Sequence, residues 1–176
     1  MRTLRLFPAL LLASLLLAAP LRAAKPEEGH VAVGGIAGLV VPFESDYSLG
    51  FQLEGSLDYY LSSSVAIRAT GGYLRHGTEL DGDPTVSSGY FLASAVYVWD
   101  QGSVRPFVQG GLGFHAIEPV DGGRSGRLGL HVGGGAEFLL DRRFAIVGQA
   151  LVHFVGGVGD RSSTFAGLAA GVRYHF

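Results

Sequence analysis

Apolar and polar residues alternate along the chain from about position 30, which is the period of β-strands, whose successive side chains point to opposite faces. Phe51, Leu53 and Leu57 share one face of such a segment, whereas Glu54 and Asp58 share the other. Strands in soluble proteins usually have 5–6 residues, but these segments have about 12, more than the roughly 9–11 needed to cross a bilayer. The pattern predicts eight membrane-spanning strands, at 30–43, 49–60, 65–76, 88–99, 104–116, 127–140, 143–155 and 163–176.

The predicted connections alternate in length. Tight ones lie at 62–64, 100–103 and 141–142, and longer ones at 44–48, 77–87, 118–125 and 156–162. Short periplasmic turns and longer outer loops are typical of outer-membrane barrels, in which an even number of strands returns both termini to the periplasm. The predicted fold is all-β, an eight-stranded antiparallel up-and-down transmembrane β-barrel.

The polar face of the strands distinguishes this fold from a soluble sandwich or lipocalin-like barrel, whose apolar face would point inward. Glycines and charges share this face, which suits the narrow lumen of an eight-stranded barrel. Because buried charges need partners, we expect an ion-pair network that plugs the lumen. Its predicted members are Glu54, Asp58, Arg68, Arg105, Glu137 and Arg173. Arg75, near an outer end, departs from the pattern, and the segment 88–99, apolar on both faces, leaves its register open.

The apolar face carries aromatic residues close to the strand ends. Trp and Tyr are enriched where a membrane meets water, so this placement resembles two interfacial girdles. The residues concerned are Phe43, Tyr59, Tyr73, Trp99, Phe144, Phe154, Tyr174 and Phe176.

The N-terminus has the order of a secretory signal peptide. Arg2 and Arg5 precede an apolar stretch at 6–21, and small residues follow at Ala23 and Ala24. The stretch is short for a membrane-spanning helix, although a retained anchor is the alternative interpretation. The predicted division is a signal peptide at 1–23 and an outer-membrane barrel domain at 24–176.

Composition narrows the possible functions. The chain has 28 Gly, most of them inside apolar segments, and no Cys, so packing and hydrogen bonds must hold an exported fold without disulfides. Removal of the predicted signal peptide would leave 10 basic and 15 acidic residues with no basic stripe, which argues against nucleic acid as a partner.

Two segments resemble the outer-membrane β-barrel family that includes the small OmpA- and OmpX-type proteins. The segment 105–114, RPFVQGGLGF, looks like the Pro-aromatic-x-x-Gly-x-Gly strand of that family. The alternating Val172, Tyr174 and Phe176 are similar to the terminal signal by which the outer-membrane insertion machinery recognises such proteins. The resemblance implies a Gram-negative outer-membrane protein that contacts that machinery during assembly, as well as membrane lipid and lipopolysaccharide. We expect a monomer without a cofactor.

The expected role is structural or in envelope interaction, without enzymatic activity. Three alternatives stay open: a narrow gated channel, a lipid A-modifying barrel enzyme and a soluble periplasmic ligand-binding barrel. The enzyme would need a nucleophile, a base and an orienting group in reach of one another, and the sequence offers no convincing spacing for them.

All six histidines are predicted to point inward. His115, His131 and His153 lie on consecutive strands near the outer mouth, where converging imidazoles could bind a divalent transition metal. The other interpretation is that they are isolated polar residues of the lumen. Outside the lumen, basic residues at the outer end could meet lipopolysaccharide phosphates or simply be solvated: Arg75, Arg124 and Arg127.

Overall fold

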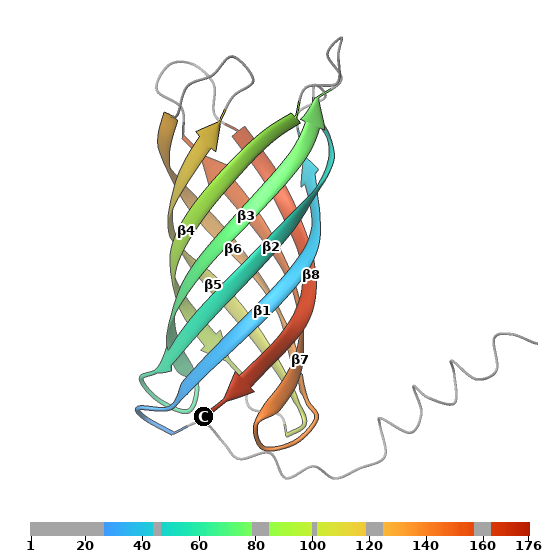
Figure 1. The fold of residues 1–176 in the computed structure, drawn as a ribbon. Helices are drawn as coiled ribbons and strands as arrows, with labels where there is room; N and C mark the ends of the chain where they lie inside the picture. Colours follow the sequence, from blue (N-terminus) through green and yellow to red (C-terminus); the bar gives the residue numbers. More distant parts are fainter. Residues whose placement is uncertain (1–26, 44–46, 79–84, 100–101, 119–124, 157–162) are drawn as a thin grey trace, which may run out of the picture.

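Eight antiparallel strands form one closed barrel (Figure 1). The computed structural model describes residues 27–43, 47–78, 85–99, 102–118, 125–156 and 163–176. The strands are 12 to 15 residues long, and each pairs with its neighbour in the chain, while β1 also pairs with β8. The predicted fold class is therefore confirmed. The strands are β1 (Val31–Pro42), β2 (Tyr47–Tyr60), β3 (Val65–Thr78), β4 (Thr85–Val98), β5 (Val104–Glu118), β6 (Ser125–Leu139), β7 (Phe144–Val155) and β8 (Ser163–His175).

Several strands extend further than the apolar pattern predicted. Gly77 still pairs with Thr85, and Ile117 with Ser125, so the connections predicted at 77–87 and 118–125 shorten to 79–84 and 119–124. Main-chain pairing needs only backbone N–H and C=O groups, so it continues where the side-chain pattern has become polar. The contrast in length between the two sets of connections is consequently smaller than predicted.

Both described ends of the chain lie at one end of the barrel, together with the connections 61–64, 99–103 and 140–143; we name this the terminal end (Figure 1). Two of its turns are closed by side chains. Ser62 Oγ accepts the N–H of Val65 at 3.1 Å. The Asp141 carboxylate accepts the N–H groups of Arg143 and Phe144 at 2.6 and 2.7 Å, and these hydrogen bonds lower its pKa. Such local bonds favour tight turns.

Side chains alternate between the outward face and the lumen as the sequence pattern predicted. Leu53 is 59% exposed and Leu128 is 74% exposed, whereas Glu54 and Arg173 are only 4% and 3% exposed. In β4, whose register the sequence left open, Tyr90 and Leu92 face the lumen. No helix that is long and apolar enough to span a membrane occurs in the described ranges.

The aromatic residues predicted for two girdles lie on the outward face, while Phe91, in the middle of β4, is exposed as well. Most are more than 40% exposed, and Tyr174 is half-buried. At the terminal end, the Tyr97 and Trp99 rings pack edge to face at 4.9 Å, as do those of Phe144 and Tyr174.

Some glycines are required by the close approach of neighbouring strands. A Cβ at Gly111 would overlap the carbonyl oxygen of Ala93, and one at Gly171 would overlap that of Gly35. At these two positions glycine thus has a steric cause in the close approach of the neighbouring strand.

Candidate functional site

The lumen holds the polar side chains that the sequence singled out. All six predicted network residues are less than 5% exposed, and they come from β2, β3, β5, β6 and β8. Apolar side chains pack around them in two clusters, one containing Phe107 and Tyr60, the other containing Leu92 and Phe165. Polar and apolar side chains therefore both line the interior, which is narrow in a barrel of eight strands.

An ion-pair cluster occupies the part of the lumen nearer the terminal end. Arg68 donates from Nε and Nη2 to the two carboxylate oxygens of Asp58 at 2.7 and 2.8 Å. Arg173 Nη1 lies 3.4 Å from Asp58 Oδ2 and donates to Glu137 Oε1. Two arginines therefore share Asp58, and Arg173 links it to Glu137.

Phe107 supports this cluster. The guanidinium carbons of Arg68 and Arg173 lie 5.0 and 6.0 Å from the centre of its ring, within the range of cation–π attraction. Arg105 is buried on the same strand, directly opposite Glu137 in the β5–β6 register.

A belt of hydrogen bonds crosses the middle of the lumen. Arg68 Nη1 donates to Gln109 Oε1 at 3.0 Å, and Gln109 Nε2 donates to Gln149 Oε1 at 3.3 Å. Gln149 Nε2 and the Tyr90 hydroxyl then donate to the two oxygens of Glu54 at 3.1 and 2.7 Å.

The belt changes the expected role of Glu54. The described hydrogen bonds to this carboxylate come from neutral side chains, while the described salt bridges join Asp58, Arg68, Glu137 and Arg173. Gln109, Gln149 and Tyr90 are absent from the predicted network, which contains charged residues only. The same alternation would have placed the two glutamines in the lumen.

A pair of histidines lies beside Glu137, at the side of the network that is nearer the terminal end. Nε2 of His30 and Nδ1 of His175 lie 3.2 Å apart in a hydrogen bond, and their rings stack at 5.4 Å. His175 Nε2 is 3.5 Å from Glu137 Oε2. His30 precedes β1, and its partial burial, together with the nearby His175 and Arg105, lowers its pKa below the ordinary value of 6.5.

His115, His131 and His153 lie close together in the opposite half of the lumen. The His153 ring centre is 5.8 Å from that of His115 and 6.0 Å from that of His131. Phe165 stacks on His153 at 4.6 Å, and Nε2 of His131 is hydrogen-bonded to Ser94 Oγ at 2.7 Å.

This geometry does not support the predicted metal site. Across the described residues, no group of three or more His, Cys, Asp or Glu side chains is placed to hold a metal ion. The His131 and His153 rings are stacked with an interplanar angle of 29°, and Nε2 of His131 is hydrogen-bonded to Ser94.

The remaining predicted residues are only partly described. His175 is buried, as predicted, whereas His30 is half-buried at the terminal end. Arg75 is exposed and Arg127 half-buried. Arg124, the side chain of His76 and the segment 1–23 lie outside the described residues.

The sequence matches one protein family over nearly its whole length. The profile described as "Outer membrane protein beta-barrel domain" matches residues 9–176, and a search of curated proteins found no match.

Solved structures share the same fold. The barrel is similar to Neisserial surface protein A, with a TM-score of 0.66 and 21% identity over 83% of this chain and 97% of that one. It is also similar to the N-terminal β-barrel domain of Pseudomonas aeruginosa OprF (TM-score 0.61, 18% identity, 86% and 100% of the two chains). The outer membrane enzyme PagL is a third example (0.52, 16%, 81% and 97%). At these identities the likeness shows the fold alone.

Proposed function

Because this chain belongs to the family of outer membrane β-barrel proteins, we propose that it is an integral barrel of the bacterial outer membrane with a structural or envelope-interaction role. In this proposal, the lumen is closed by its ion pairs and the protein carries out no chemistry of its own. Both termini face the periplasm, residues 1–23 are a cleaved signal peptide, and the mature barrel is a monomer.

The observation that carries the closed lumen is the unbroken set of contacts from Glu137 to Glu54. It passes through Arg173, Asp58 and Arg68, and then through the glutamine belt. A permeating ion would have to break charge-assisted hydrogen bonds, which are about twice as strong as neutral ones, and leave buried charges without partners. The closed state is therefore favoured over a conducting one.

Planar-bilayer recording of the purified protein tests this proposal. We expect no steady conductance from the wild type or from Leu53→Ala, which changes only the outward face. Glu137→Ala removes one end of the charged cluster and is the variant in which leakage should first occur. Steady channels in the wild type at neutral pH would overturn the closed lumen and favour the gated-channel alternative.

The orientation of the histidines supports a non-enzymatic role. A site acting on lipid A would have to face the outer leaflet, whereas His115, His131 and His153 are buried in the lumen. Mass spectrometry of lipid A from cells with and without the protein tests this role, and a changed acyl pattern that depends on the protein would refute it.

Localisation and processing need a separate test. We expect the protein in the detergent-soluble membrane fraction, with heat-modifiable mobility on gels and an N-terminus at Ala24 by mass spectrometry. Recovery in the soluble periplasmic fraction would instead favour the ligand-carrier alternative.

A further inference from the structure

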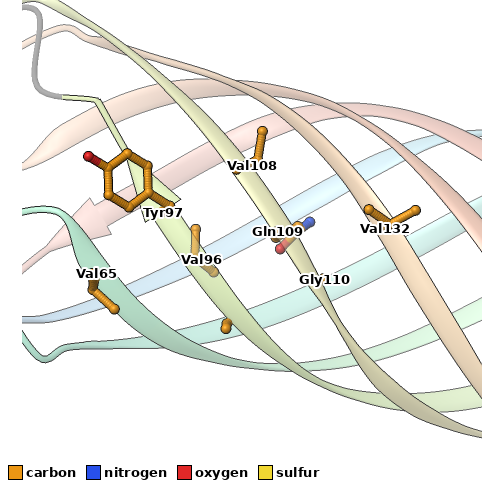
Figure 2. A pocket seen from close by; sticks show the side chains of 8 residues that line it. Val65, Val96, Tyr97, Val108, Gln109, Gly110 and Val132 are labelled. Atoms are coloured by element: carbon orange, nitrogen blue, oxygen red, sulfur yellow. The ribbon is translucent and has the colours of Figure 1, made fainter.

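A hollow of about 390 Å³ lies on the outward face of the barrel, over β3 to β6 (Figure 2). The outward-facing side chains around it are apolar apart from one hydroxyl: Val65, Ala95, Tyr97, Val108, Gly110 and Val132.

The register explains its shape. Ala95 on β4 is paired directly with Gly110 on β5, so two of the smallest residues form the floor. In the same row, Val132 on β6 pairs with Gly110, so a larger side chain forms the wall on that side. Val65 lines the hollow from β3.

One end of the hollow is marked by aromatic residues. In the next row toward the terminal end, Tyr97 is paired with Val108, and Figure 2 shows the Tyr97 ring standing at that side. The Tyr97 ring packs against Trp99 at 4.9 Å. Since Tyr and Trp favour the headgroup level of a membrane, the hollow extends from this level into the hydrocarbon region.

We propose that this hollow holds one acyl chain of a glycerophospholipid from the periplasmic leaflet. The inference rests on the proposed function, which places the outward face in lipid and the terminal end at the periplasm. An unfilled hollow in hydrocarbon would forfeit dispersion contacts along its lining. A flexible methylene chain fills it without any polar partner, while the headgroup stays level with Tyr97 and Trp99.

Two substitutions test the site with matched chemistry. Ala95→Leu places a large apolar side chain in the floor. Gly148→Leu adds the same side chain to the outward face of β7, away from the hollow, where a Cβ meets nothing within 4 Å. Both proteins are prepared as the full mature chain in vesicles of defined glycerophospholipid.

Native mass spectrometry after release from these vesicles gives the first readout. We expect one retained phospholipid on the wild type and on Gly148→Leu, and retention about tenfold lower on Ala95→Leu, equivalent to about 1.4 kcal/mol. Equal retention in all three proteins overturns the proposal, as does preferential retention of lipopolysaccharide offered in parallel. A mass of two chains that disappears in Ala95→Leu would assign the hollow to a second copy instead.

Trp99 gives a second readout, since it is the one Trp of the chain. Phospholipid brominated near the headgroup end of its acyl chain should quench wild-type fluorescence at about tenfold lower mole fraction than is needed for Ala95→Leu. Identical quenching curves would contradict the site.

Insertion and heat-modifiable mobility are checked for every protein. If the wild-type chain does not insert, the proposed function is contradicted. If it inserts but retains no phospholipid selectively, only the phospholipid site is contradicted.

Discussion

Arg68 holds both carboxylate oxygens of Asp58, the residue directly opposite it in the β2–β3 register, at 2.7 and 2.8 Å inside the barrel. Both side chains are at most 3% exposed. The bidentate geometry strengthens this ion pair. Because both groups are buried, however, removal of either one leaves the other as an uncompensated charge.

Asp58→Ala should therefore destabilise the barrel by about 3–5 kcal/mol. The loss leaves Arg68 without its carboxylate and removes one of the two carboxylates near Arg173. Urea unfolding of the protein in vesicles measures the change. The double variant Asp58→Leu with Arg68→Met should recover part of the loss, because it removes both charges. A double variant less stable than Asp58→Ala would contradict this account.

Tyr90→Phe should destabilise the barrel by about 1.5–3 kcal/mol, the usual value of a hydrogen bond to a charged group. The variant removes the hydroxyl that donates to Glu54 at 2.7 Å and retains the ring. Tyr59→Phe is the matched control, since its ring faces outward and is 48% exposed. Equal unfolding midpoints for the two variants would argue against the belt.

Stability should fall in mild acid through His30. Burial lowers the pKa of His30 in the folded protein, so the unfolded chain takes up the proton first. The contribution is fully present above the ordinary pKa of 6.5 and is lost as the pH falls from there through the folded pKa. NMR titration of the imidazole should show a midpoint below 6.5, and His30→Gln should reduce the pH dependence of unfolding over that range. A midpoint above 6.5 would reverse the sign.

Phe176→Ala should impair assembly in cells more than stability. The Phe176 ring is 70% exposed at the outward face, so its removal should change the free energy of unfolding by no more than about 0.5 kcal/mol. The proposed contact with the insertion machinery would be lost, and the heat-modifiable form in the membrane should decrease. Phe43→Ala, 61% exposed at the opposite end, is the control. Equal assembly of the two variants would refute a terminal signal.

The local alternation of apolar and polar residues was enough to predict most of the fold. The opposite orientations of Leu53 and Glu54 follow from the two-residue period alone, and so does the burial of Arg173. The orientation of β4 could not be predicted in this way, because both of its faces are apolar in sequence. Tyr90 was therefore not predicted as the partner of Glu54.

Contacts that depend on the register of several strands could not be predicted from the sequence. Gln109, Gln149 and Glu54 meet across the lumen from strands that are not neighbours in the sheet. The floor of the hollow needs the register of Ala95 against Gly110. The metal prediction placed three histidines on consecutive strands, but alternation says nothing about how their rings are rotated.

The seam between β1 and β8 has a consequence for biogenesis. Ala32, close to the start of the first strand, pairs with His175, the residue before the C-terminal Phe176. Until β8 has been synthesised, β1 has an edge whose N–H and C=O groups would face hydrocarbon without partners. The wall therefore closes only when β8 pairs with β1, so the strand made first waits for the eighth before all of its main-chain groups have partners.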